Sequence, residues 1–193
     1  MKITVVILLL VLAHLLFAAP IPYTSEGWST PVNGVKARFS FAEGNIVNGT
    51  RLIQVYLELK NVSDLGNPLY LYFDPSASVR GEVRNSANKG VKGSGGPFDQ
   101  LIPSPYIITL PRDSTLIINV TANGWGVPKD EKALIGMMND DWMIKRGDTA
   151  EYYLTGTFLA GQPPKEVDGQ VWTGTIQIPT RRIDVLNPAK PGK

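Results

Sequence analysis

Apolar and polar residues alternate along short runs of the chain, and Gly, Pro, Asn and Asp interrupt these runs. Alternation with a period of two is typical of antiparallel strands that bury one face. The two clearest early runs cover 35–42 and 52–60. The residues expected to face inward in them are Val35, Ala37, Phe39, Phe41, Ile53, Val55, Leu57 and Leu59. The same pattern directs Gln54, Glu58 and Lys60 to water.

The remaining runs predict further strands and two long loops. The strands are expected at 69–73, 79–84, 106–110, 115–121, 149–159 and 171–178. The charges of 79–84 suit an exposed sheet edge. The loops cover 85–105 and 122–140, and the second has room for a helical turn at 128–134. Loops of this length are usually functional or mobile.

The C-terminal part of the chain carries the clearest strand pattern. The residues expected to face inward there are Ala150, Tyr152, Leu154, Phe158, Trp172, Ile176 and Ile178. Pro179 is expected to interrupt the ladder, and 183–186 to resume it at a sheet edge. Trp142 shares its register with Ile144 and is predicted to lie in the core, whereas Trp28 is expected to pin the N-terminal stretch to the domain.

The strand pattern fits either a sandwich or a barrel, and a family resemblance favours the sandwich. Residues 148–154 read Asp-Thr-Ala-Glu-Tyr-Tyr-Leu, which resembles the strand-F signature of immunoglobulin domains, with Leu154 where a cysteine would stand. The Trp-x-Gly at 172–174 resembles the strand-G entry of exported immunoglobulin-like domains. The resemblance implies an immunoglobulin-like antiparallel β-sandwich with long loops. It also implies a tyrosine corner, in which the Tyr152 hydroxyl bonds backbone near 146–148.

The N-terminus has the layout of a secretory signal peptide. Lys2 is followed by an apolar run that closes on Ala18 and Ala19. We expect a signal peptide at 1–19 and a secreted or periplasmic protein; the alternative is an uncleaved membrane anchor at 3–19. The domains expected after the signal are an extended segment at 20–34, the immunoglobulin-like sandwich at 35–186 and a disordered tail at 187–193.

Composition narrows the chemistry. Loss of Lys2 with the signal would take the 19 basic side chains to 18, against 17 acidic ones, so the mature chain has no electrostatic attraction to nucleic acid or an anionic membrane. The chain has no cysteine, and its one histidine, His14, lies in the signal. These absences exclude Ser-His-Asp and Cys-His catalysis and His/Cys zinc sites. We expect no enzyme activity and no cofactor.

Few residues suggest chemistry of their own. Asn139, Asp140 and Asp141 form the densest acidic group, for which a turn, a Ca²⁺ site and an acid–base pair are alternatives; we favour a turn, because adjacent carboxylates on a strand point to opposite faces. The glycine-rich 92–96 lacks the ending of a phosphate-binding loop and is expected to be a surface loop.

Two further sets concern the surface. Trp125 stands between two glycines and could stack on a sugar ring, or plug one end of the sandwich. Asn48, Asn61 and Asn119 begin Asn-x-Ser/Thr sequons, which would accept glycan only in a eukaryotic secretory pathway.

These observations favour a non-enzymatic binding or structural module of the cell surface or periplasm, which works through loops at one end of the sandwich. Its partner would be a surface polymer or a protein. A carbohydrate-binding module that uses Trp125 is one alternative. A hydrolase that uses carboxylates alone, such as a glycosidase, is another.

Export is directly testable. We expect the mature protein to begin near Pro20 and to lie outside the cytoplasm, because 1–19 combine a charged start, an apolar run and a small-residue end. N-terminal sequencing of the secreted or periplasmic fraction checks this. A chain that still starts at Met1 and needs detergent for extraction would indicate the membrane anchor.

Overall fold

A computed structural model describes residues 27–64, 66–93, 104–121, 129, 131–138, 140–163 and 167–186. The predicted signal peptide, the C-terminal tail and Trp125 lie outside these ranges. The elements are β1 (Val35–Val47), β2 (Thr50–Asn61), β3 (Leu69–Phe73), β4 (Val79–Asn85), β5 (Tyr106–Leu110), β6 (Thr115–Asn119), β7 (Ala133–Met137), β8 (Asp140–Ile144), β9 (Tyr152–Ala160), β10 (Gln170–Trp172), β11 (Gly174–Arg182) and the 3-10 helix η1 (Asp184–Leu186). Within the described ranges, no helix is long and apolar enough to cross a membrane.

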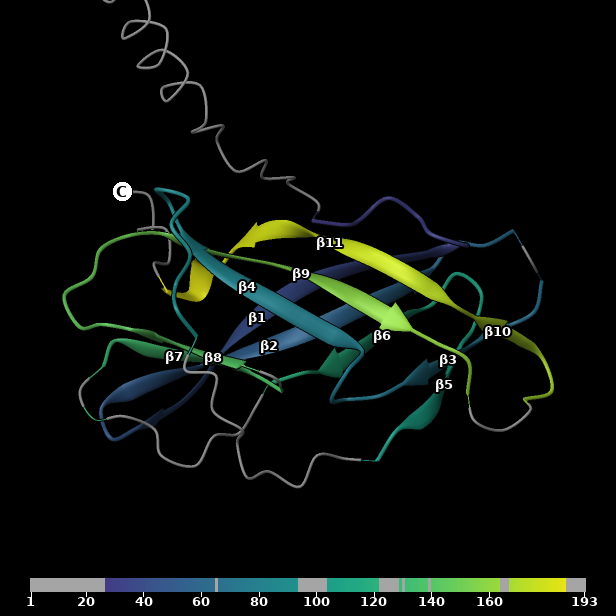
Figure 1. The fold of residues 1–193 in the computed structure, drawn as a ribbon, viewed down its shortest axis with the longest axis horizontal. Helices are drawn as coiled ribbons and strands as arrows, with labels where there is room; N and C mark the ends of the chain where they lie inside the picture. Colours follow the sequence, from purple (N-terminus) through teal and green to yellow (C-terminus); the bar gives the residue numbers. More distant parts are fainter. Residues whose placement is uncertain are drawn as a thin grey trace, which may run out of the picture.

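The described strands form three sheets (Figure 1). Sheet A has the order β1-β2-β7-β8, and β6 also pairs with β2. Sheet B has the order β10-β3-β5, with β10 and β3 parallel. Sheet C has the order β11-β9-β4 and is antiparallel throughout. The prediction of an all-β fold is confirmed, and β4 is an edge strand as its charges indicated.

Sheets A and C face each other across the core. The Phe39 ring of β1 lies so close to Gly156 of β9 that an added Cβ would stand 2.9 Å from it. Met137 of β7 meets Gly81 of β4 in the same way, at 2.7 Å. Nearly all residues predicted to face inward are buried, and Phe41 and Ala150 are partly buried against the same core. The two paired glycines thus let the layers approach closely.

β2 is the central strand of sheet A. On one side it pairs with β1 through a hairpin whose tip is Asn48–Gly49, with φ values of 52° and 79°. Positive φ at both positions identifies a type I′ turn, for which Asn-Gly is the preferred sequence. On its other side β2 pairs first with β7 and then with β6. Between the parts of β2 that pair with β7 and with β6, Thr121 bonds the backbone of Val55. Its hydroxyl accepts a hydrogen bond from the Val55 N–H at 2.8 Å and donates one to the Val55 carbonyl at 3.2 Å.

The segment predicted as one strand at 171–178 belongs to two sheets. β10 runs parallel to β3 in sheet B, whereas β11 runs antiparallel to β9 in sheet C. Trp172, at the end of β10, remains in the core and stacks on Phe158 of β9 with ring centroids 5.6 Å apart. Phe158 in turn stacks on Phe73 of β3 at 6.5 Å. Aromatic packing therefore joins sheet B to sheet C.

Two local predictions are wrong. The helical turn expected at 128–134 fails at Ala133 and Leu134, which begin β7. All five residues of β7 are buried, so the strand shows no alternation that the sequence could reveal. The strand expected at 183–186 is instead η1, and β11 continues through Pro179 to Arg182. A register shift between Ile178 and Arg181 accommodates the missing N–H of the proline.

Glu58 does not point into water as predicted. Its residue is 7% exposed, because Arg38 pairs with its carboxylate at 2.7 Å. The Arg38 guanidinium lies 4.4 Å from the centre of the Trp28 ring, a cation–π arrangement. Trp28 thereby packs the N-terminal segment against sheet A, as expected. Ser29 adds two hydrogen bonds to Ala37, which extend the edge of β1.

Tyr152 is buried as predicted, but its hydroxyl bonds a side chain. It donates to the carboxylate of Asp148 at 2.5 Å, and the backbone bond expected from the tyrosine corner is not the one observed. Burial raises the pKa of Tyr152, and the bond to Asp148 raises it further. The same bond lowers the pKa of Asp148, helped by the N–H of Ala150.

We expect Tyr152→Phe to lower the free energy of unfolding by about 1–2 kcal/mol at pH 7, because a charge-assisted hydrogen bond is lost. The raised pKa of Tyr152 contributes stability below its unfolded value of about 10, and this is lost as pH rises further. The lowered pKa of Asp148 contributes stability above about pH 4, and this is lost as pH falls. Chemical denaturation at pH 7 and pH 11 should therefore show the difference from wild type shrinking at the higher pH.

Tyr153→Phe is the matched control. The Tyr153 hydroxyl donates to Glu151 on the outer face of sheet C, where water can replace it. We expect a change within about 0.5 kcal/mol, as is usual for surface substitutions. Equal losses for the two variants, or a Tyr152 effect that does not change with pH, would contradict the assigned role of the Tyr152–Asp148 bond.

Candidate functional site

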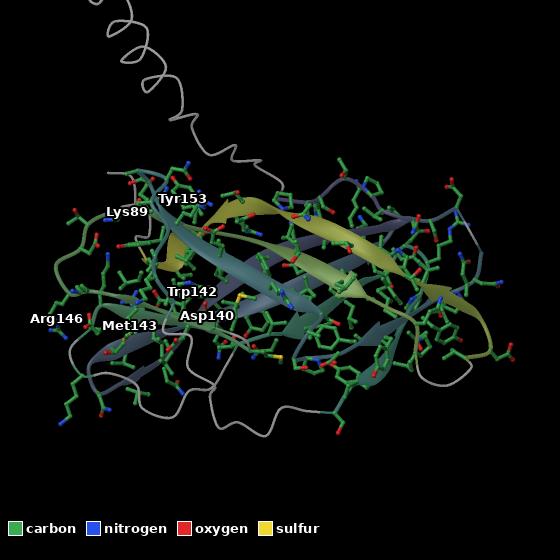
Figure 2. All side chains as sticks on the ribbon, viewed as in Figure 1. Lys89, Asp140, Trp142, Met143, Arg146 and Tyr153 are labelled. Carbon is green, nitrogen blue, oxygen red and sulfur yellow. The ribbon has the colours of Figure 1, made fainter. Side chains whose placement is uncertain are left out.

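The predicted loop site is only partly within the described residues. Trp125 lies outside them, so its role as a stacking face or a plug stays a prediction. Residues 86–93 of the 85–105 loop lie at the end of the fold opposite β10, residues 104–105 directly precede β5, and the part between lies outside the described residues. Figure 2 labels Lys89 of this loop, well away from the β10 end.

Of the acidic group at 139–141, Asp140 and Asp141 begin β8 opposite β7, and Asn139 lies outside the described residues. Asp140 pairs with Met137 and starts β8 directly after the turn. Asp141 is buried, and the two carboxylates leave opposite faces of the strand, as expected from their adjacency. In the glycine-rich 92–96, Gly93 lies directly against the Asp140 carboxylate, which disfavours a phosphate at that position, and 94–96 lie outside the described residues. Among the described residues, no three His, Cys, Asp or Glu side chains could together hold a metal ion.

The three sequons differ in their surroundings. Asn48 is exposed at the β1–β2 turn, and Asn119 is exposed at the end of β6. Asn61 is fully buried: its Nδ2 donates to the Leu110 carbonyl at 3.0 Å, and its Oδ1 accepts from the N–H and hydroxyl of Ser63. A glycan at Asn61 is incompatible with this arrangement, because the whole side chain is buried and hydrogen-bonded.

A hollow of about 490 Å³ opens at the β10 end of the fold. It lies between the 33–34 turn, the segment that follows β2, and β10 with the residue after it. The lining residues are Asn33, Gly34, Val62, Ser63, Asp64, Gln170, Val171, Trp172 and Thr173. Its volume falls within the range of about 300–1,000 Å³ typical of small-molecule sites. We call this region the end hollow.

Hydrogen bonds lock the three walls of the end hollow together. Val32 and Val35 close a two-residue turn at Asn33–Gly34, and the N–H of Val62 donates to the Gly34 carbonyl at 2.7 Å. The Asn33 amide donates to the Thr173 carbonyl at 3.0 Å. Trp172 Nε1 donates to the Val32 carbonyl at 2.9 Å. The hollow is therefore formed before any ligand arrives, which reduces the entropy cost of binding.

Gly34 is required where the turn meets the segment after β2. Its φ is 80°, and an added Cβ would stand 2.5 Å from the Cβ of Ser63. The buried Asn61 amide holds Ser63 in this position, because its Oδ1 accepts hydrogen bonds from the Ser63 N–H and hydroxyl. Gly34 and Asn61 thus determine how closely the turn at 33–34 approaches the segment after β2.

The end hollow is polar and nearly uncharged. Among the described residues that line it, Asp64 is the one charged side chain, and it is exposed. Asn33, Ser63, Gln170 and Thr173 supply amides and hydroxyls. This lining can donate and accept hydrogen bonds, but it offers no cation to an anionic ligand.

Sequence reasoning missed the end hollow, and the recognition surface that it placed at the loops 85–105 and 122–140 stays a prediction. One local signal was available, because Asn33-Gly34 is a preferred turn sequence next to the first strand. The approach of Gln170–Thr173 to that turn carries no local signal, since the two segments lie far apart in the chain.

A second, smaller hollow of about 250 Å³ lies on the outer face of sheet C. Its floor is the backbone of Gly81 and Gly156, and its rim includes Arg80, Glu82 and Gln177. It lies on strands and not between loops, and its rim charges have opposite signs. The end hollow is the stronger candidate.

Comparison with protein families, with curated proteins and with solved structures returns no match for this chain. The candidate site therefore depends on geometry alone.

We expect Asn61→Ala to lower the free energy of unfolding by about 2–3 kcal/mol, because buried partners at Leu110 and Ser63 lose their hydrogen bonds. Asn67→Ala, an exposed asparagine in the same connection, should change it by less than about 0.5 kcal/mol. Urea denaturation measures both values. Similar stabilities for the two variants would show that the Asn61 amide does not support the wall of the hollow.

Proposed function

We propose that this protein is an exported, non-enzymatic binding module with an immunoglobulin-like sandwich, and that it recognises its partner through the end hollow. The observation that carries the proposal is the preformed hollow itself, which lies among connecting segments at one end of two packed sheets. Recognition residues fall preferentially on loops that a rigid scaffold positions.

The strand pairing supports an immunoglobulin-like assignment. Immunoglobulin domains pair strands A, B and E in one sheet and strands G, F and C in the other. Here β1, β2 and β6 pair in sheet A, and β11, β9 and β4 pair in sheet C in the corresponding order along the chain. In this correspondence β9 is strand F, which is the strand that carries the Asp-x-Ala-x-Tyr signature. Sheet B and the β7–β8 hairpin are additions.

The same correspondence gives the end hollow a recognisable place. Its walls come from the B–C connection at 62–64 and the F–G connection at 170–173. These two connections lie at the antigen-binding end of immunoglobulin variable domains. A role in binding needs no catalytic group, and the chain beyond His14 has neither His nor Cys with which to build the common hydrolytic sites.

The test is saturable binding to an envelope preparation from the source organism. Co-sedimentation with the purified protein should give a saturable isotherm. Asp64→Arg combined with Gln170→Arg should weaken binding by about tenfold or more, because both changes place long cations in the end hollow.

Lys89→Glu is the matched control, since it changes charge at the opposite end of the fold. We expect it to leave the isotherm unchanged. Absence of saturable binding, equal weakening by Lys89→Glu, or release of cleaved polymer from the preparation would each overturn the proposed function.

A further inference from the structure

The outer face of sheet B continues the end hollow as an aromatic surface. Leu69, Leu71 and Phe73 of β3 point into the core, so Tyr70 and Tyr72 occupy the opposite face. The ladder places Val171 of β10 beside Tyr70, and Ile107 of β5 beside Tyr72. Ile107 is 40% exposed, and both tyrosines are partly exposed. We call Tyr70, Tyr72, Ile107 and Val171 the tyrosine face.

The tyrosine face and the end hollow are contiguous. Val171 belongs to both, since it lines the hollow and pairs with Tyr70. Gly169 lies against the Tyr70 ring, where an added Cβ would collide with the ring carbons. The missing side chain lets the chain pass the ring and enter the wall of the hollow at Gln170. A ligand seated in the hollow can therefore extend over the tyrosines.

We infer that this combined surface binds a neutral saccharide, an inference that rests on the proposed binding role of the end hollow. The sugar ring would stack on Tyr70, and its hydroxyls would bond the polar residues of the hollow. Sugar rings present apolar C–H faces and a periphery of hydroxyls. An aromatic face beside a set of amides, hydroxyls and one carboxylate matches both parts.

The charges of the surface favour this ligand over the alternatives. Asp64 is the one charged side chain among the described residues of the hollow and the tyrosine face. A carboxylate repels phosphate, sulfate and uronate groups but accepts two adjacent hydroxyls of a sugar. The Asn33 amide is already oriented by its bond to the Thr173 carbonyl, which suits a ligand with fixed hydroxyl directions. An anionic polymer or lipid surface would need cations that this lining lacks.

A printed array of neutral and anionic oligosaccharides provides the first test, followed by calorimetric titration of the best neutral oligosaccharide. We expect binding to neutral members only. Tyr70→Ala should weaken it by about tenfold or more, as for an aromatic anchor at the centre of an interface, and Gln170→Ala should weaken it severalfold.

Matched controls lie on other sheets. Tyr56→Ala removes a partly exposed tyrosine from the outer face of sheet A, and Gln177→Ala removes an exposed glutamine from sheet C. Both should leave the affinity within about twofold of wild type. Thermal denaturation of all four variants identifies any loss that comes from unfolding.

Two treatments of the envelope preparation separate the saccharide inference from the proposed function. Periodate, which cleaves vicinal diols, should abolish binding, whereas protease digestion should not. Binding that depends on the end hollow but survives periodate and is lost on proteolysis would overturn the saccharide inference and leave the binding module intact. If the protein binds neither the array nor the untreated preparation, both the saccharide inference and the proposed function are overturned. Binding equally weakened by Tyr56→Ala and Tyr70→Ala would remove the tyrosine face as its site.

Discussion

The Trp172 indole holds together three parts of the fold that are distant in sequence. Its ring stacks on Phe158 of sheet C, although the residue itself belongs to sheet B. Its Nε1 donates to the Val32 carbonyl, which anchors the N-terminal turn. Because the chain has no cysteine, such packing and hydrogen bonding hold these segments together without a disulfide. Trp172 therefore links sheet B to sheet C and to the turn at 33–34, and it also lines the end hollow.

Close approach of backbone to side chain recurs wherever two sheets or segments meet. Gly156 admits Phe39 between sheets A and C, Gly34 admits Ser63 at the wall of the hollow, and Gly169 admits Tyr70 at its rim. At each position an added Cβ would stand less than 3.0 Å from its neighbour, closer than Cβ contacts in proteins allow. The proposed binding surface is thus a product of the same packing that closes the core, and its geometry is rigid for the same reason.

The distribution of apolar, charged and polar residues over the fold is consistent with a binding role. Apolar residues of all three sheets form the core, and charged side chains of β4 and β11 take part in surface ion pairs such as Arg84 with Glu82 and Arg182 with Glu151. The polar residues of the end hollow make few contributions to the core. Asn33 and Gln170 are exposed, and Asn33 supports the turn through its positive φ and its hydrogen bond to the Thr173 carbonyl.

The alternation of apolar and polar residues predicted the strands that bury one face, because side chains on such a strand alternate between the core and water. It therefore identified β1, β2, β3, β5 and β9 and the burial of Trp142, Trp172 and Tyr152. It failed at β7, which is buried on both faces, and at Glu58, which is covered by residues from elsewhere. Only the tertiary structure decided that β10 pairs with β3, that Asn61 is buried, and that 33–34, 62–64 and 170–173 enclose a hollow. Such contacts join segments distant in the chain, and no local pattern of residues encodes which of them will meet.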